Sequence, residues 1–193
     1  MNRTGTYVAF DGLGEKDPAK SDFKFYSILL GWAENENIEF NITNSHDKAC
    51  SVSDDSCWET LKKSIQQRFR GSKNMLVVLS RNTRKTGSVL SEEIAWAIDT
   101  YQIPLIIAYV DYRVIANPRS LSSYWPNALS SRIANDTTHA IHIPFAQKAI
   151  LAAIKQFTPS NHPIGAGYGY YSEETYRNWG LLKARETFQH TPK

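Results

Sequence analysis

The chain has 193 residues, of which 41% are hydrophobic and 12% aromatic, so it is long enough to bury the core of one domain. The net charge of +3 is too small to indicate nucleic-acid binding by itself. The two cysteines, Cys50 and Cys57, are too few for a disulfide framework. Residues 1–12 lack the apolar core of a signal peptide, and no apolar run approaches the ~20 residues that span a bilayer. We therefore expect a cytoplasmic protein that binds neither membranes nor nucleic acid.

Strands and helices alternate along the first part of the chain. Residues 4–12, "TGTYVAFDG", are typical of a strand, and residues 21–35, "SDFKFYSILLGWAEN", have apolar residues at helical spacing. Residues 37–42, "NIEFNI", predict a short second strand. Residues 57–71, "CWETLKKSIQQRFRG", predict a second helix that ends at a glycine. The apolar run 74–80, "NMLVVLS", predicts a strand that is buried on both faces.

The alternation continues to residue 157. We predict a helix over 89–101, a doubly buried strand over 103–110, a short helix near 125–134, a fifth strand over 140–145 and a final helix over 146–157. This order predicts an α/β fold with a mostly parallel five-stranded sheet and helices on both faces. Residues 1–157 would form this domain. Residues 158–193 are rich in Pro and Gly and then in aromatics, and they predict an extension that packs on the domain or at an interface.

Two adjacent glutamates lie near the start of the predicted helix 89–101. In an open parallel sheet, ligands bind outside the carboxyl ends of the strands, and this helix begins at that edge. At ~100° per residue, Glu92 points away from the apolar stripe of the helix, whereas Glu93 lies about a quarter turn from the stripe. We therefore expect Glu92 to face solvent and Glu93 to lie at the rim of the site. The helical spacing alone leaves Glu93 either structural or catalytic.

Other polar residues follow the ends of the predicted strands. Phe10 and Asp11 end the first strand, and Ser45 and His46 lie in the polar loop after the second strand. Arg81 and Arg84 follow the third strand, at the end of a segment, 62–85, that has eight basic residues and no acidic one. This basic segment is either a solvated surface or a loop that attracts phosphate.

Several other kinds of site are disfavoured. His46, Cys50 and Cys57 do not have the spacing of a zinc site and lack a fourth ligand, so no metal is expected. No P-loop is present, and "GAGYGY" in the extension neither follows a strand nor opens a helix. A receiver domain would need a phosphorylatable Asp after the third strand, where the sequence is "VVLSRN".

The chain resembles the TIR-like domains of the Thoeris antiphage defence family over roughly residues 5–157. The resemblance rests on "YVAFDG", "NSHD", "SCWETLKKSIQQRF" and "LVVLSRNT…SVLSEEIAWAI" leading into "PLIIAYV". It implies a flavodoxin-like TIR fold and NAD+ as a substrate, with no cofactor. It also implies that one glutamate in the helix after the third strand is catalytic, and matching "SEEIAWAI" identifies this residue as Glu93.

The resemblance implies a function and roles for the remaining candidates. The enzyme would be an NAD+ nucleosidase or ADP-ribosyl cyclase that makes a cyclic ADP-ribose-type signal for a separate effector, and it would self-associate on activation. Phe10 would stack on nicotinamide or fill the core, and Asp11 would bind a ribose hydroxyl or cap the turn at Gly12. The polar loop residues Ser45 and His46 would line the pocket, and Arg81 and Arg84 would face the diphosphate. The alternative is a non-catalytic TIR-like module that self-associates or binds a nucleotide. The isomer of the product and the trigger stay open.

Overall fold

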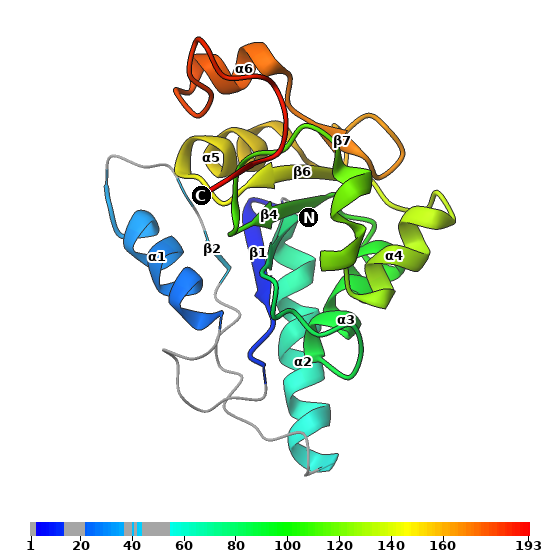
Figure 1. Ribbon diagram of the computed structural model, residues 1–193. Helices are drawn as coiled ribbons and strands as arrows, with labels where there is room; N and C mark the ends of the chain where they lie inside the picture. Colours follow the sequence, from blue (N-terminus) through cyan, green and yellow to red (C-terminus); the bar gives the residue numbers. More distant parts are fainter. Residues whose placement is uncertain (1–2, 14–21, 37–39, 41, 44–54) are drawn as a thin grey trace.

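The computed structural model describes residues 3–13, 22–36, 40, 42–43 and 55–193 (Figure 1). Its main sheet has the strand order β2-β1-β3-β4-β6-β7, and every pair of neighbours is parallel. The strands are β1 (Gly5–Phe10), β2 (Ile42–Thr43), β3 (Ser72–Leu79), β4 (Leu105–Tyr109), β6 (Ala140–Pro144) and β7 (Gly169–Tyr170). The predicted α/β fold with a five-stranded parallel sheet is confirmed. The two-residue strand β7, from the extension, adds a sixth strand beside β6.

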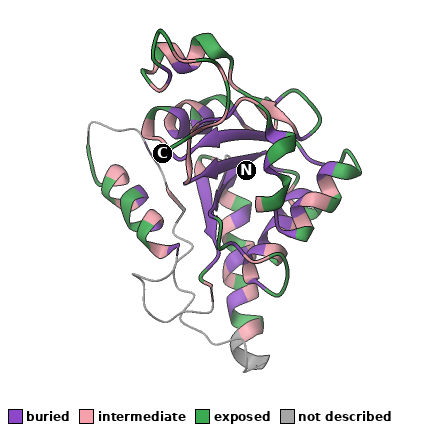
Figure 2. Ribbon diagram, in the orientation of Figure 1, coloured by how far each residue is buried: buried purple, intermediate pink, exposed green. Residues whose placement is uncertain are grey.

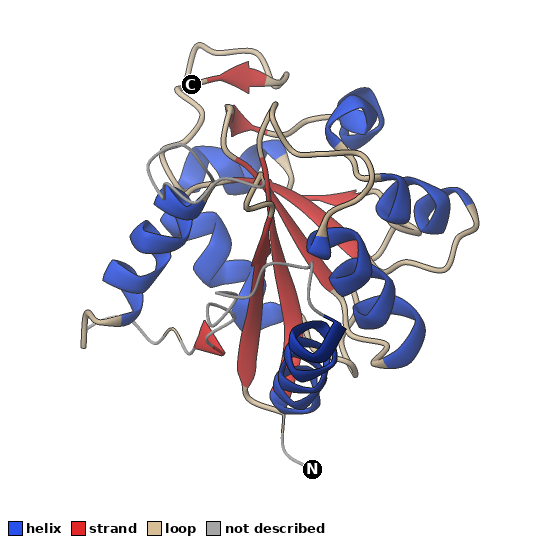
Figure 3. Cartoon of the chain, turned by 90° about the horizontal axis from the view of Figure 1, so that it is seen from below, coloured by secondary structure: helices blue, strands red, loops and turns tan. Residues whose placement is uncertain are grey.

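Helices cover both faces of this sheet (Figures 1 and 3). Helices α1 (Phe23–Ala33) and α5 (Gln147–Gln156) pack on one face, and α2 (Asp55–Gly71), α3 (Val89–Ala95) and α4 (Asn127–Ala134) pack on the other. Side chains of the strands alternate between the two faces: Met75, Val77 and Leu79 of β3 face α2 and α3, whereas Leu76 and Val78 face α1 and α5. The sheet is therefore buried on both sides, as Figure 2 shows.

The predicted helix 89–101 has two parts. The α-helical part, α3, ends at Ala95, and a π-helical turn, η2, spans Trp96–Thr100. The N–H of Tyr101 donates to the carbonyl of Trp96, five residues earlier, so the turn is one residue wider than an α-helical turn. Helical spacing in the sequence does not distinguish these two forms, because both place apolar residues on one side over so short a segment.

The second predicted strand lies only partly within the described residues. The structure pairs Ile42 and Thr43 with Thr6 and Tyr7 of β1. The predicted range 37–42 lies largely outside the described residues, as do the polar loop with Ser45 and His46 and the position of Cys50.

Beyond β7, the extension packs back on the domain through α6 (Glu173–Asn178) and β8 (Thr191–Pro192). Helix α6 buries Tyr176 together with Leu182 against Val114 of β5 (Tyr112–Val114). The short strand β8 pairs antiparallel with β5. Sequence periodicity predicts neither β5 nor β8, because each short strand is stabilised by a partner about 75–80 residues away in the chain.

A buried polar network joins the extension to the sheet. The ring of His142 on β6 lies with Nδ1 2.7 Å from the hydroxyl of Tyr109 on β4 and Nε2 2.8 Å from the carbonyl oxygen of Gly167. The indole N–H of Trp125 donates to the same Tyr109 hydroxyl at 2.7 Å. Burial lowers the pKa of His142 to about 4, so the imidazole is neutral at pH 7 and donates from one nitrogen while accepting at the other.

Candidate active site

Glu93 points from α3 toward the sheet, whereas its neighbour Glu92 is exposed to solvent. The two side chains point in different directions, in agreement with the rotation of about 100° per residue in an α-helix. The expected position of Glu93 at the rim of the site is wrong, because the residue is fully buried, with 0% of its surface exposed. Glu93 lies in the second turn of α3 and contacts Tyr7, which is in the middle of β1.

The hydroxyl of Tyr7 on β1 donates a hydrogen bond to Oε1 of Glu93, with an oxygen–oxygen distance of 2.5 Å. Both residues are fully buried. Burial, followed by the negative charge of Glu93 and the hydrogen bond to it, raises the pKa of Tyr7 well above its usual value, so the phenol keeps its proton. The carboxylate of Glu93 is therefore held by a permanent donor inside the domain.

Aromatic residues fix the ring of Tyr7. Phe69 of α2 stacks on this ring with a centroid distance of 4.2 Å and an interplanar angle of 23°. Phe69 stacks in turn on Tyr101 at 5.0 Å and 21°. Tyr7 also lies in the paired part of β1, opposite Met75 of β3. The hydroxyl that meets Glu93 is thus positioned by both the sheet register and the core packing.

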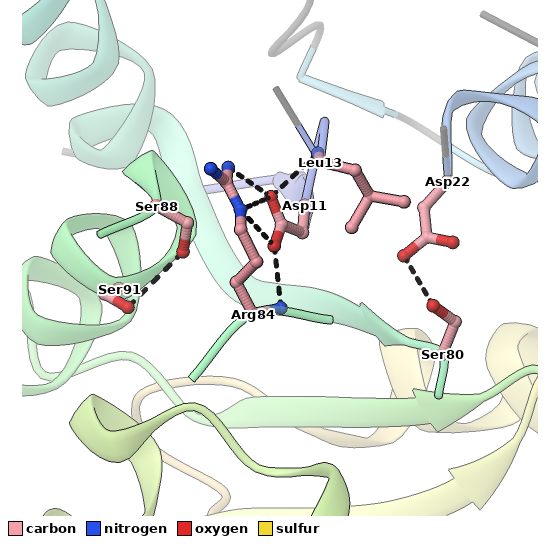
Figure 4. A network of polar contacts seen from close by, with 7 residues as sticks. All are labelled: Asp11, Leu13, Asp22, Ser80, Arg84, Ser88 and Ser91. Carbon is pink, nitrogen blue, oxygen red and sulfur yellow. Dashed lines mark hydrogen bonds and ion pairs between the residues drawn. The ribbon is translucent and has the colours of Figure 1, made fainter. Parts of the chain in front are cut away.

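Asp11 forms an ion pair with Arg84 at the carboxyl end of β1 (Figure 4). The guanidinium donates from two nitrogens, and the closest contact is 2.7 Å, from a terminal nitrogen of the guanidinium to Oδ1 of Asp11. The backbone N–H of Arg84 donates to Oδ2 at 2.8 Å, and that of Leu13 donates to Oδ1 at 2.9 Å. Asp11 therefore caps the turn at Gly12, which is one of its two expected roles, and Arg84 directs its fork at this carboxylate.

These hydrogen bonds decide the charge of the pair. Burial raises the pKa of Asp11, but the hydrogen bonds from Arg84 and Leu13 lower it by more, so the carboxyl titrates below its usual range. The hydrogen bond to Asp11 raises the pKa of Arg84. Both groups stay charged at pH 7, and together they fix the loop that follows β3 against the loop that follows β1.

A second carboxylate at this edge has no counterpart among the sequence-based candidates. Asp22, directly before α1, is buried, and its Oδ2 accepts a hydrogen bond of 2.9 Å from the hydroxyl of Ser80 at the end of β3 (Figure 4). Burial raises the pKa of Asp22 to about 6. Its place before an apolar helix indicates a helix cap, but no side-chain capping bond is formed at this position. The sequence offered no signal for the contact with Ser80, which is 58 residues away.

Phe10 lies on the opposite face of the sheet from Glu93. It stacks on Tyr26 of α1 at 5.5 Å and 29° and belongs to the apolar cluster between the sheet, α1 and α5. Arg81 is largely exposed, with its Nε 3.7 Å from Oδ2 of Asp111. The structure thus brings Asp11 and Arg84 together and separates Phe10 from Glu93. Ser45 and His46 lie outside the described residues.

In the part of the chain that the structure describes, no three His, Cys, Asp or Glu side chains are grouped so that they could hold a metal ion. Among the helices described, none is both long and apolar enough to cross a bilayer.

The parallel sheet with helices on both faces agrees with the flavodoxin-like fold of a TIR-like domain, and Glu93 lies in the helix after β3, where the resemblance places it. A family model described as "Thoeris protein ThsB, TIR-like domain" matches residues 7–114, which is more than half of the 193 residues. The chain therefore belongs to this family and is a TIR module of antiphage defence. The match includes β1 from Tyr7 onward, the whole of α3 and both members of the Tyr7–Glu93 pair.

Proposed function

We propose that this TIR module cleaves NAD+ at the bond between nicotinamide and ribose and makes a cyclic ADP-ribose-type signal for a separate effector. Its membership of the Thoeris family supports the role in defence. The observation that carries the chemical part is the carboxylate of Glu93, which the family motif singles out and which Tyr7 holds in the interior of the domain.

The chemistry requires only one carboxylate. When the C–N bond breaks, its electron pair leaves with nicotinamide, which departs as a neutral molecule and needs no proton. The ribose becomes cationic, like the oxocarbenium ion of glycoside hydrolysis, and a carboxylate beside it stabilises that charge. Glu93 then accepts the proton of the attacking hydroxyl, as a general base does. Attack by water gives ADP-ribose, and attack by another hydroxyl of the same molecule gives a cyclic product.

The low-dielectric surroundings of Glu93 strengthen its effect on a developing positive charge. The same burial means that a substrate reaches Glu93 only after the side chains that cover it have moved. We therefore expect the domain to open at this site when it is activated, and self-association during infection would supply the free energy for opening. The proposed partners are NAD+, further copies of this chain and the effector.

The second candidate is a non-catalytic TIR-like module that self-associates or binds a nucleotide without turnover. Two observations favour it: Glu93 is inaccessible, and Arg84 is paired with Asp11, so both residues expected near ribose and diphosphate already have a partner. This candidate predicts that NAD+ is not consumed even in infected cells.

One experiment separates the two candidates. The full chain, taken from infected and from uninfected cells, is incubated with NAD+, and the products are identified by mass spectrometry. Glu93→Gln should abolish the product, whereas Glu92→Gln is the matched control, because its side chain is exposed one residue earlier on the same helix. Equal losses in both folded variants, or NAD+ that remains intact with the unchanged chain from infected cells, would refute the enzymatic proposal.

A further inference from the structure

We propose that Tyr7 is a positioning residue for Glu93: its hydroxyl holds the carboxylate in the orientation in which it acts on the ribose. The role of Glu93 rests on the proposed function, whereas the contact between the two side chains is independent of it. Tyr7 does not have to touch the substrate for this role.

The hydrogen bond is short and lies between two separate elements. Its 2.5 Å length is at the short end of the range for a hydroxyl that donates to a carboxylate. Tyr7 is on a central strand and Glu93 is on a helix 86 residues later in the chain. The carboxylate of a glutamate rotates about its Cγ–Cδ bond, and the helix does not fix this rotation. A donor that is fixed to the sheet therefore sets the plane of the carboxylate.

The core packing holds the donor in place. The ring of Tyr7 lies against Phe69, and Phe69 lies against Tyr101, in one stack of three rings. Neighbours of β1 on both sides fix the backbone of Tyr7 through its pairing with Thr43 and Met75. The hydroxyl therefore cannot follow Glu93 if the carboxylate turns, and it returns the carboxylate to one orientation.

Packing alone does not require this hydroxyl. Apolar side chains such as Ile65, Leu90 and Ile94 pack on this face, and the charge of Arg68 on α2 also acts on Tyr7. A phenylalanine would keep the ring and the stack, and an apolar residue in place of Glu93 would avoid the cost of burying a polar pair. Because the ring alone would fill this place in the core, we infer that the hydroxyl serves to orient the carboxylate of Glu93.

The kinetic test uses Tyr7→Phe, which keeps the ring and removes the hydroxyl. For the full chain under conditions in which it makes product, we expect kcat to fall about 10- to 100-fold, the range for the loss of one hydrogen bond to a charged group, while KM for NAD+ stays within about twofold. Tyr176→Phe is the matched control, since Tyr176 is also fully buried but belongs to a separate cluster with Val114 and Leu182. A Tyr7→Phe variant with unchanged kcat would overturn the positioning role.

A spectroscopic test does not depend on activity. In a chain labelled with ¹³C at the glutamate side-chain carboxyls, the signal missing from Glu93→Gln identifies Glu93. We expect Tyr7→Phe to shift this signal and Tyr176→Phe to leave it in place. A signal unaffected by Tyr7→Phe overturns the inference. Should Tyr7→Phe fail to fold, a ¹³C label on the tyrosine hydroxyl carbons gives the reverse test, in which Glu93→Gln must shift the Tyr7 signal. Absence of product from the unchanged chain would instead count against the proposed function.

Discussion

The buried His142 makes the stability of the domain depend on pH in a way that can be calculated. The pKa of the imidazole falls from 6.5 in the unfolded chain to about 4 in the folded one because it is buried. Between these values the unfolded chain binds more protons than the folded chain, so the free energy of unfolding falls as the pH is lowered. At about 1.4 kcal/mol per pKa unit, the total loss is about 3 kcal/mol below pH 4, and about 2 kcal/mol of it has occurred by pH 5.

The measurement compares two chains, so that all other titrating groups cancel. The variant His142→Gln replaces the imidazole by an amide that also has one donor and one acceptor but does not titrate. Urea unfolding of both chains at pH 7.5 and pH 5 gives four free energies of unfolding. We expect the unchanged chain to lose about 2 kcal/mol more than the variant over this interval. A difference between the chains that is the same at both pH values would refute the buried neutral state of His142.

Three further predictions concern stability. Asp22→Asn should stabilise the chain by up to about 3 kcal/mol at pH 8, because the folded carboxyl has a pKa of about 6 and is charged there at a cost in free energy. At pH 4.5 this gain should be about 2 kcal/mol smaller, because the carboxyl is then largely protonated in the folded chain. Urea unfolding of both chains at the two pH values measures the difference. Gly169→Ala should destabilise the domain by about 1–3 kcal/mol, because the added Cβ would lie 2.8 and 2.9 Å from two backbone oxygens. Gly31→Ala in α1 is the control: its Cβ would meet nothing within 4 Å, and the substitution should stabilise the domain by about 0.5–1 kcal/mol. Equal shifts of the unfolding temperature for the two variants would contradict this prediction. Arg84→Ala should cost about 1.5–3 kcal/mol, because it removes the charged donors to the buried carboxylate of Asp11 but keeps the two backbone donors. Arg81→Ala should cost less than about 0.5 kcal/mol, because Arg81 is largely exposed. Similar urea midpoints for these two variants would show that the ion pair adds little.

The order of elements could be predicted because it depends on patterns within single segments. The apolar runs that form β3 and β4 and the periodic apolar residues of α5 are read directly from neighbouring residues in the sequence. The different exposure of Glu92 and Glu93 is also local, since it follows from the rotation of one helix. Such features need no knowledge of what lies opposite in the fold.

The contacts of the candidate site could not be predicted in the same way. In the sequence, Tyr7 is indistinguishable from the other apolar residues of its strand. The partner of its hydroxyl is known only from the fold, in which α3 places Glu93 beside it. Asp11 had two possible partners, ribose and the turn, and the choice depended on Arg84, 73 residues later. The full burial of Glu93 could not be predicted either, because a helical wheel gives the direction of a side chain but not how many other residues cover it.

The outer strands of the sheet have a consequence for how copies of the chain can meet. Within the described residues, β2 at one edge and β7 at the other are two residues long each, whereas the strands between them span five to eight residues. Very short edge strands offer few free backbone groups, and proteins use them to prevent the sheet of one molecule from continuing into that of another. At the β7 edge, the proposed association of copies should therefore proceed through side chains of helices and loops, which keeps assembly reversible and distinct from fibre-like aggregation.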